Sequence, residues 1–124
     1  MRIDKKFEEL TAMELYFLYL DEDKFVKALE GFSNLTGYGV SEFIGCAFPS
    51  EYESWEEGYF GDTGVKFEVE PPAVDETKYE IVPNENFFDL LEEMAHQYVV
   101  AVPLEKSKVE FLLNKIRTVL LFDK

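Results

Sequence analysis

The stretch FPSEYESWEEGYFGDTGVKFEVEPPAVDETKYEIV, residues 48–82, combines two strand patterns with a dense group of acidic and aromatic residues. Apolar and charged residues alternate over 65–69 and, less regularly, over 77–81, which is typical of half-buried β-strands. The Pro71-Pro72 break between them predicts an antiparallel hairpin. We expect the odd-numbered positions of both strands to face the core, and the opposite face to carry Glu68, Glu70, Glu76, Lys78 and Glu80.

The segment before this stretch carries a helical pattern followed by a bend. Residues 25–32 place apolar side chains at helical spacing behind an acidic first turn. The glycines at 37 and 39 predict a bend into a strand over 40–48. Residues 1–20 are the least defined part of the chain, because the short apolar run 15–20 fits a helix or a strand.

The segment after it predicts two further helices. Asn84 or Asn86 is the expected N-cap of the first, and residues 105–120 carry the apolar stripe of the second. The predicted fold class is α+β, with a small antiparallel sheet flanked by three or four helices. We expect one domain over residues 1–124, with residues 1–20 as a less certain N-terminal extension.

Composition restricts the classes of partner. The chain of 124 residues has a net charge of −14 and is 47% apolar, which indicates a folded protein with a strongly acidic surface. Nucleic acids and anionic membranes repel such a surface, whereas basic proteins are attracted to it. The N-terminal residues lack the apolar core of a signal peptide, and the run 15–20 is too short to span a bilayer, so we expect a cytoplasmic protein.

Acidic and aromatic residues gather in the middle of the chain. Between positions 51 and 80 there are ten acidic residues and two lysines, which gives a net charge of −8. Aromatic side chains supply contact area in protein interfaces, and carboxylates accept paired hydrogen bonds from arginine. Our first-choice binding residues are Tyr52, Glu53, Trp55, Glu56, Glu57, Tyr59 and Asp62, and our second choices are Glu68, Glu70, Asp75 and Glu76. Alternatively, Trp55 is a core residue beneath a loop, and the acids are a solvated surface.

The sequence offers little for catalysis or metal binding. One histidine, His96, and one cysteine, Cys46, cannot form a zinc site, and residues 62–70 lack the glycine position of a calcium loop. None of the serines lies in a nucleophile elbow. We therefore predict no catalytic residue, no metal and no cofactor. A small enzyme with a carboxylate pair remains an alternative, since acids are abundant.

Four segments of the chain resemble one known family. They are LEGFSNLTGYG (29–39), CAFPSEYESWE (46–56), GVKFEVEPPAVDETKYEIVPNENFFDLLEEMAHQY (64–98) and VEFLLNKIRTVL (109–120). In the order of their glycines, aromatics, strands and helices they resemble CdiI-type immunity proteins. These proteins accompany ribonuclease toxins of bacterial contact-dependent inhibition and related polymorphic toxin systems. The resemblance covers roughly residues 22–120.

The resemblance implies an inhibitor that forms a heterodimer with one cognate toxin nuclease domain. Such an inhibitor would occlude the basic surface with which the toxin grips RNA, in agreement with the acidity of the chain. The resemblance supplies no binding residues by position, so the choices above depend on charge and aromatic character alone. A general acidic adaptor that mimics nucleic acid and binds several basic partners is a further alternative.

Overall fold

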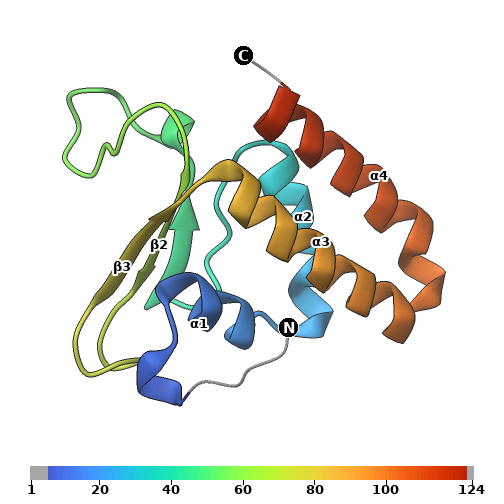
Figure 1. Cartoon of the computed structure of the whole chain (residues 1–124), viewed down its shortest axis with the longest axis horizontal. Helices are drawn as coiled ribbons and strands as arrows, with labels where there is room; N and C mark the ends of the chain where they lie inside the picture. Colours follow the sequence, from blue (N-terminus) through green and yellow to red (C-terminus); the bar gives the residue numbers. More distant parts are fainter. Residues whose placement is uncertain (1–5, 123–124) are drawn as a thin grey trace.

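A three-stranded antiparallel sheet packs by one face against the helices in the computed structural model, which describes residues 6–122 (Figure 1). The predicted α+β class is therefore confirmed. Residues 1–5 of the N-terminal extension lie outside the described part of the chain. The elements are α1 (Ala12–Tyr19), α2 (Phe25–Ser33), β1 (Ile44–Ala47), β2 (Val65–Val69), β3 (Lys78–Val82), α3 (Asn84–Ala101) and α4 (Lys106–Arg117).

The segment 12–19 is a helix, which decides between the two structures expected for the apolar run near the N-terminus. Thr11 caps it by a reciprocal pair of bonds: the Glu14 amide donates to Thr11 Oγ1 (3.1 Å), and the Thr11 amide donates to Glu14 Oε1 (2.9 Å). Tyr16 and Phe17 on α1 are buried against the sheet. Pattern alone could not choose the helix, because the cap lies upstream of the apolar run.

The sheet has the order β1-β2-β3, and the predicted hairpin of β2 and β3 is confirmed. Strand β1 is shorter than the expected 40–48. The amides of Val40 and Ser41 both donate to the carbonyl oxygen of Ile44 (2.9 and 3.3 Å). This turn occupies the residues that precede the strand, so the ladder with β2 begins at Ile44 opposite Val69.

The facing of β3 differs from the prediction. Phe67 pairs with Glu80, so Glu80 lies on the inner face, and Tyr79 and Ile81 lie on the outer face. Their side chains are 56% and 42% exposed. Lys78 likewise faces inward, opposite Val69. The expectation that positions 79 and 81 face the core was therefore wrong.

The inward charges of β3 bind the backbone of the N-terminal elements. Lys78 Nζ donates to the carbonyl oxygens of Glu8 (3.1 Å) and Leu10 (2.7 Å), and the Glu80 carboxylate accepts from the amide of Met13 (3.2 Å) at the start of α1. Because β3 is an edge strand, its inner face meets unpaired backbone groups of that segment as well as apolar side chains. Polar residues there satisfy donors and acceptors that apolar ones would leave unpaired.

The core is built around aromatic rings. Phe87 of α3 lies within 5.4–6.2 Å, between ring centroids, of four other rings, and it is fully buried. They come from α1, α2, the end of β1 and β2: Phe17, Phe32, Phe48 and Phe67. A single ring of α3 therefore connects both layers of the fold.

Asn84 does not cap α3 as expected. Pro83 is the N-cap, and the Asn84 side chain instead accepts from the Gly64 amide (3.1 Å) and donates to the carbonyl oxygen of Leu120 (3.1 Å). It thus connects the start of β2 to the C-terminal segment. Helix α4 gives way to a wider turn over Thr118–Phe122. Among the helices in residues 6–122, none combines the length and apolar character that crossing a membrane requires.

Candidate protein-binding surface

Residues 49–64, which we call the acidic loop, leave β1 and return to β2 at one end of the sheet (Figure 1). A short turn, Pro49–Glu51, starts the loop. One oxygen of the Glu51 carboxylate accepts from the amides of Phe48 (2.7 Å) and Gly37 (3.0 Å). Glu51 therefore ties the base of the loop to the segment beside β1, a structural role that the sequence analysis missed.

Trp55 projects from the acidic loop into solvent. Its side chain is 79% exposed, and Glu53, Glu56 and Glu57 beside it are exposed as well. The alternative in which Trp55 is a core residue beneath the loop was therefore wrong. An exposed indole contributes nothing to the core, whereas it offers a large contact area to a partner.

Lys66 of β2 holds the acidic loop against the sheet. Its ammonium nitrogen lies 4.4 Å from the ring centroid of Tyr52 and 5.5 Å from that of Phe60, and it donates to the carbonyl oxygen of Gly58 (3.3 Å). The two rings pack edge to face at 6.0 Å. Lys66 is only 7% exposed, although it lies on the outer face of the sheet. The loop, rather than the core, buries it.

Two of the predicted carboxylates take part in the internal structure of the loop. Asp62 accepts from the hydroxyl of Tyr59 (2.5 Å), a bond that raises the pKa of the Tyr59 phenol. Glu56 accepts from the amide of Glu53 (2.7 Å) and closes a turn around Trp55. These bonds restrict the conformations of the loop, which lowers the entropy that binding would cost.

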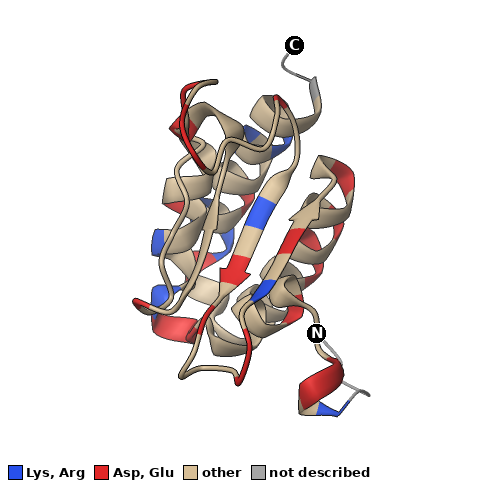
Figure 2. Cartoon of the chain, turned by 90° about the vertical axis from the view of Figure 1, so that its left-hand side faces the viewer, with Lys and Arg blue, Asp and Glu red and all other residues tan. Residues whose placement is uncertain are grey.

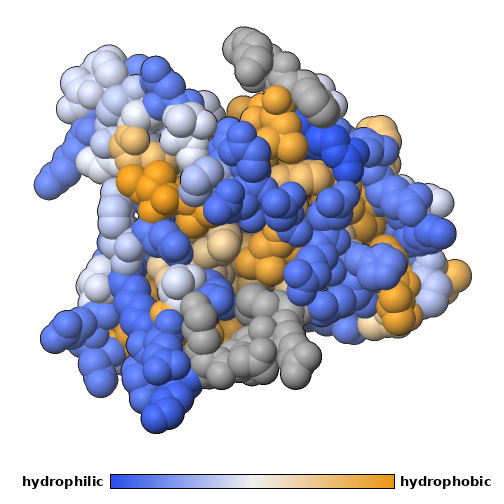
Figure 3. All heavy atoms as spheres, in the orientation of Figure 1, coloured by the Kyte–Doolittle hydropathy of each residue, from blue (hydrophilic) through white to orange (hydrophobic). Residues whose placement is uncertain are grey.

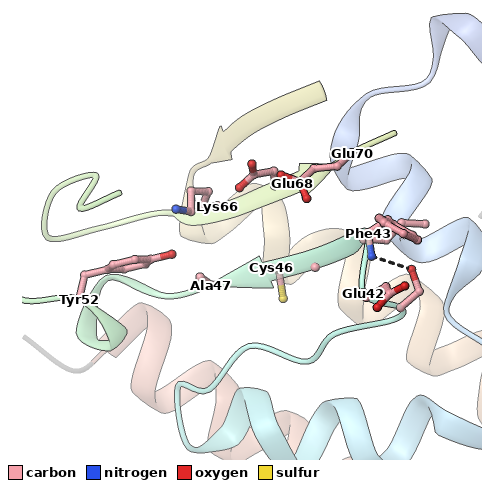
Figure 4. Close-up of a pocket in the computed structure, with 11 residues that line it drawn as sticks. Glu42, Phe43, Cys46, Ala47, Tyr52, Lys66, Glu68 and Glu70 are labelled. Atoms are coloured by element: carbon pink, nitrogen blue, oxygen red, sulfur yellow. Dashed lines mark hydrogen bonds between the residues drawn. The ribbon is translucent and has the colours of Figure 1, made fainter. Parts of the chain in front are cut away.

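The predicted hairpin residues divide into two groups. Glu68 and Glu70 line a pocket of about 240 Å³ on the outer face of the sheet, together with Glu42 and Tyr52 (Figure 4). Asp75 and Glu76 are exposed in the turn at the other end of the hairpin, away from the acidic loop. The structure therefore places Tyr52, Glu68 and Glu70 along one pocket and leaves Asp75 and Glu76 apart.

Signals for the missed residues are weak in the sequence. Between positions 51 and 80, Lys66 is one of only two lysines beside ten acidic residues, which makes it a candidate partner for residues of the same stretch. Its contact with Tyr52 and Phe60 depends on how the loop folds back. Gly58 has a φ of +100°, and a Cβ there would lie 3.2 Å from the Tyr52 ring. Glycine is thus required where the loop approaches that ring.

Hydrophilic residues cover much of the remaining surface seen beside the loop. Figure 3 shows hydrophilic atoms over much of this face, with apolar atoms in separate spots. Within residues 6–122, no three metal-binding side chains lie close enough together to hold an ion. The surface therefore offers charged groups and a few exposed rings to a partner.

Replacing Lys66 with methionine is expected to loosen the acidic loop while the protein stays folded. Methionine fills similar space, and relief of the buried charge offsets the lost ring contacts and hydrogen bond to within ~1 kcal/mol of unfolding free energy. Amide hydrogen exchange over residues 52–62 should become faster with little change in thermal midpoint. Lys27→Met, on the exposed face of α2, is the matched control. Unchanged exchange in the loop of the Lys66 variant would contradict this role.

We predict that the free energy of unfolding falls in alkaline solution because of Cys46 and Tyr16. Burial raises the pKa of the Cys46 thiol to about 11 and also raises that of the Tyr16 phenol. Above pH 9, the unfolded chain ionises these groups while the folded protein keeps them neutral. The free energy of unfolding should therefore be insensitive to both groups below pH 8 and fall as the pH rises above 9.

Urea unfolding between pH 7 and 11 measures this effect. Cys46→Ala removes one of the two groups, so its midpoint should fall less steeply with pH than that of the original protein. Equal slopes for both proteins would show that the thiol has an ordinary pKa in the folded state. The raised pKa also fits a thiol without a nucleophilic role.

Comparison with models of protein families identifies a match. A family model described as CDI immunity protein, CdiI_4, matches residues 9–113. The matched region runs from Glu9, before α1, into α4 and includes the acidic loop and the whole sheet. No curated protein sequence matches the chain significantly.

Proposed function

Because the chain belongs to the family of CDI immunity proteins, we propose that it neutralises a ribonuclease toxin by covering the toxin's basic RNA-binding or active-site surface. Immunity proteins of this family act in contact-dependent inhibition. The proposed complex is a heterodimer formed in the cytoplasm, with the acidic loop as its principal contact. The inhibitor acts by occlusion and supplies no catalytic group.

The observation that carries the proposal is the exposure of Trp55 among carboxylates. An indole that is 79% exposed is not stabilised by burial in the free protein, but it would be in a complex that covers it. Arginine, tyrosine and tryptophan dominate the binding energy of protein interfaces. The carboxylates of Glu53 and Glu57 lie beside the indole in sequence and can pair with arginines of the toxin.

Charge explains why such a loop would compete with RNA. A ribonuclease binds phosphates through lysines and arginines, and a surface with densely spaced carboxylates offers the same basic groups an alternative partner. The net charge of −14 also accelerates the encounter of the two proteins. The rigid loop bonds of Tyr59 and Glu56 keep the carboxylates in place before binding.

Charge reversal tests this proposal. We predict that a large secreted protein is encoded beside this chain, and the variable C-terminal domain of that protein is the partner to use. Replacing Glu53, Glu56 and Glu57 together with lysine should slow association at least about 10-fold and reduce inhibition of the domain's RNase activity. Surface plasmon resonance measures the rate, and RNA cleavage measures the inhibition.

The matched control makes the same change in charge elsewhere. Glu22, Asp89 and Glu110 are exposed on helical elements, and their triple lysine variant should keep association within a few-fold of the original rate. Equal losses in both triple variants would mean that net charge alone matters. Equally tight binding of unrelated basic proteins would favour a general acidic adaptor. Failure of the unaltered protein to bind or inhibit the domain would refute the proposed function.

A further inference from the structure

The outer face of the sheet is open below the acidic loop. The helices pack against the inner face, and no helix within residues 6–122 covers the other one (Figures 1 and 2). This face presents two small residues of β1, Gly45 and Ala47, and two exposed apolar residues of β3, Tyr79 and Ile81. Most sheets of this kind bury one face and solvate the other with polar residues, whereas this one leaves an apolar edge exposed.

A pocket lies between β1 and the outward side chains of β2. Its volume is about 240 Å³, with Gly45 and Ala47 among its lining residues (Figure 4). A Cβ added to Gly45 would meet no atom within 4 Å, so the absence of a side chain leaves real space there. The Tyr52 ring lies at one end of the pocket, and Glu68 and Glu70 project from β2 along it.

The carboxylates around this pocket, Glu42, Glu68 and Glu70, are not held in ion pairs within the described residues 6–122. Lys66 also lines the pocket, but its ammonium is directed to Gly58 and to the rings of Tyr52 and Phe60. The pocket therefore combines a floor of small residues with three carboxylates and one lysine, an excess of negative charge.

These features fit one kind of occupant. An arginine side chain can pair with a carboxylate through two parallel hydrogen bonds, and its charge complements the three carboxylates along the pocket. A second copy of this chain would bring further negative charge to an already acidic face, which opposes self-association there. Tyr52 belongs to both the acidic loop and the pocket, so the two surfaces adjoin.

We propose that the outer face of the sheet is a second contact surface for the toxin, and that its pocket receives an arginine of the toxin at the carboxylates of Glu68 and Glu70. This inference depends on the proposed function, and it extends the interface from the acidic loop to the uncovered strands. Tyr79 and Ile81 supply the apolar part of the same contact.

Filling the pocket separates this inference from the proposed function. The probe is the same toxin domain, inactivated by substitution so that the cells that produce it survive. Gly45→Leu should weaken its binding at least about 10-fold by steric exclusion, whereas Gly45→Ala should stay near the original affinity because its methyl group enters open space. Glu68→Lys should weaken binding to a similar extent, and Glu110→Lys on α4 should not.

A second measurement does not depend on how the variants fold. Addition of the toxin domain to the labelled original protein should shift the backbone amide signals of Gly45, Ala47 and Tyr79 in NMR spectra. Unshifted signals would overturn the second surface and leave the proposed function intact. The same conclusion would follow if Gly45→Leu and Glu68→Lys both keep the original affinity while the triple lysine variant of the acidic loop binds weakly. Dimerisation of the free protein that Gly45→Leu abolishes would overturn it in favour of self-association. Absence of any binding would remove both proposals.

Discussion

Replacing Trp55 with alanine is expected to weaken binding of the toxin domain about 30-fold or more, corresponding to a hot-spot loss of at least about 2 kcal/mol. The thermal midpoint should stay unchanged, because the indole is 79% exposed and outside the core. The loss should appear mainly as faster dissociation, since the ring contributes packing rather than long-range attraction. Surface plasmon resonance and a thermal melt of the same variant measure both quantities.

Phe111 supplies the matched control for this experiment. It is also an exposed aromatic residue, at 69%, but it lies on α4 away from the acidic loop. Phe111→Ala should leave the affinity near its original value. Equal affinity of the Trp55 variant and the original protein would remove Trp55 from the interface. A fall in the thermal midpoint would show instead that the indole supports the fold of the loop.

Replacing Phe87 with alanine is expected to reduce stability rather than binding. This ring is fully buried and in contact with four other rings, so its removal should lower the free energy of unfolding by about 3–5 kcal/mol. The loss combines the transfer free energy of the ring with the cavity that remains, because rings from both layers cannot collapse together into the space. Urea unfolding followed by circular dichroism measures it.

The size of the substituted side chain checks this explanation. Phe87→Leu leaves a smaller cavity and should cost less than the alanine variant. A loss below 1 kcal/mol for Phe87→Ala would contradict the central place of this ring in the core. The original protein and Phe87→Ala, when both are folded, should bind the toxin domain equally, because the ring is inaccessible to a partner.

Local sequence patterns predicted an element correctly where one side of that element is buried along its whole length. The alternation over 65–69 predicted β2, and β2 is the central strand, with Val65, Phe67 and Val69 all buried. The apolar stripe of 25–32 predicted α2 for the same reason. The turn Pro71-Pro72 between the strands predicted the hairpin, because a run of two prolines cannot continue the ladder.

The same reasoning failed where the environment changes along an element. Alternation in β3 suggested that Tyr79 and Ile81 face inward, but the register with β2 placed Lys78 and Glu80 there. Those charged groups are stabilised by backbone atoms of the N-terminal segment, about 70 residues away in sequence. A pattern of apolar and polar residues contains no information on such distant hydrogen-bond partners.

The sequence alone determined the α+β class, the hairpin and the strongly acidic middle of the chain, because these follow from residue periodicity and charge within short segments. Only the tertiary structure decided that Trp55 is exposed, that Lys66 is buried beneath Tyr52 and Phe60, and which face of β3 meets solvent. Exposure depends on which distant segments lie over a side chain, and that is settled when the loop folds back onto the sheet and α1 packs beneath it.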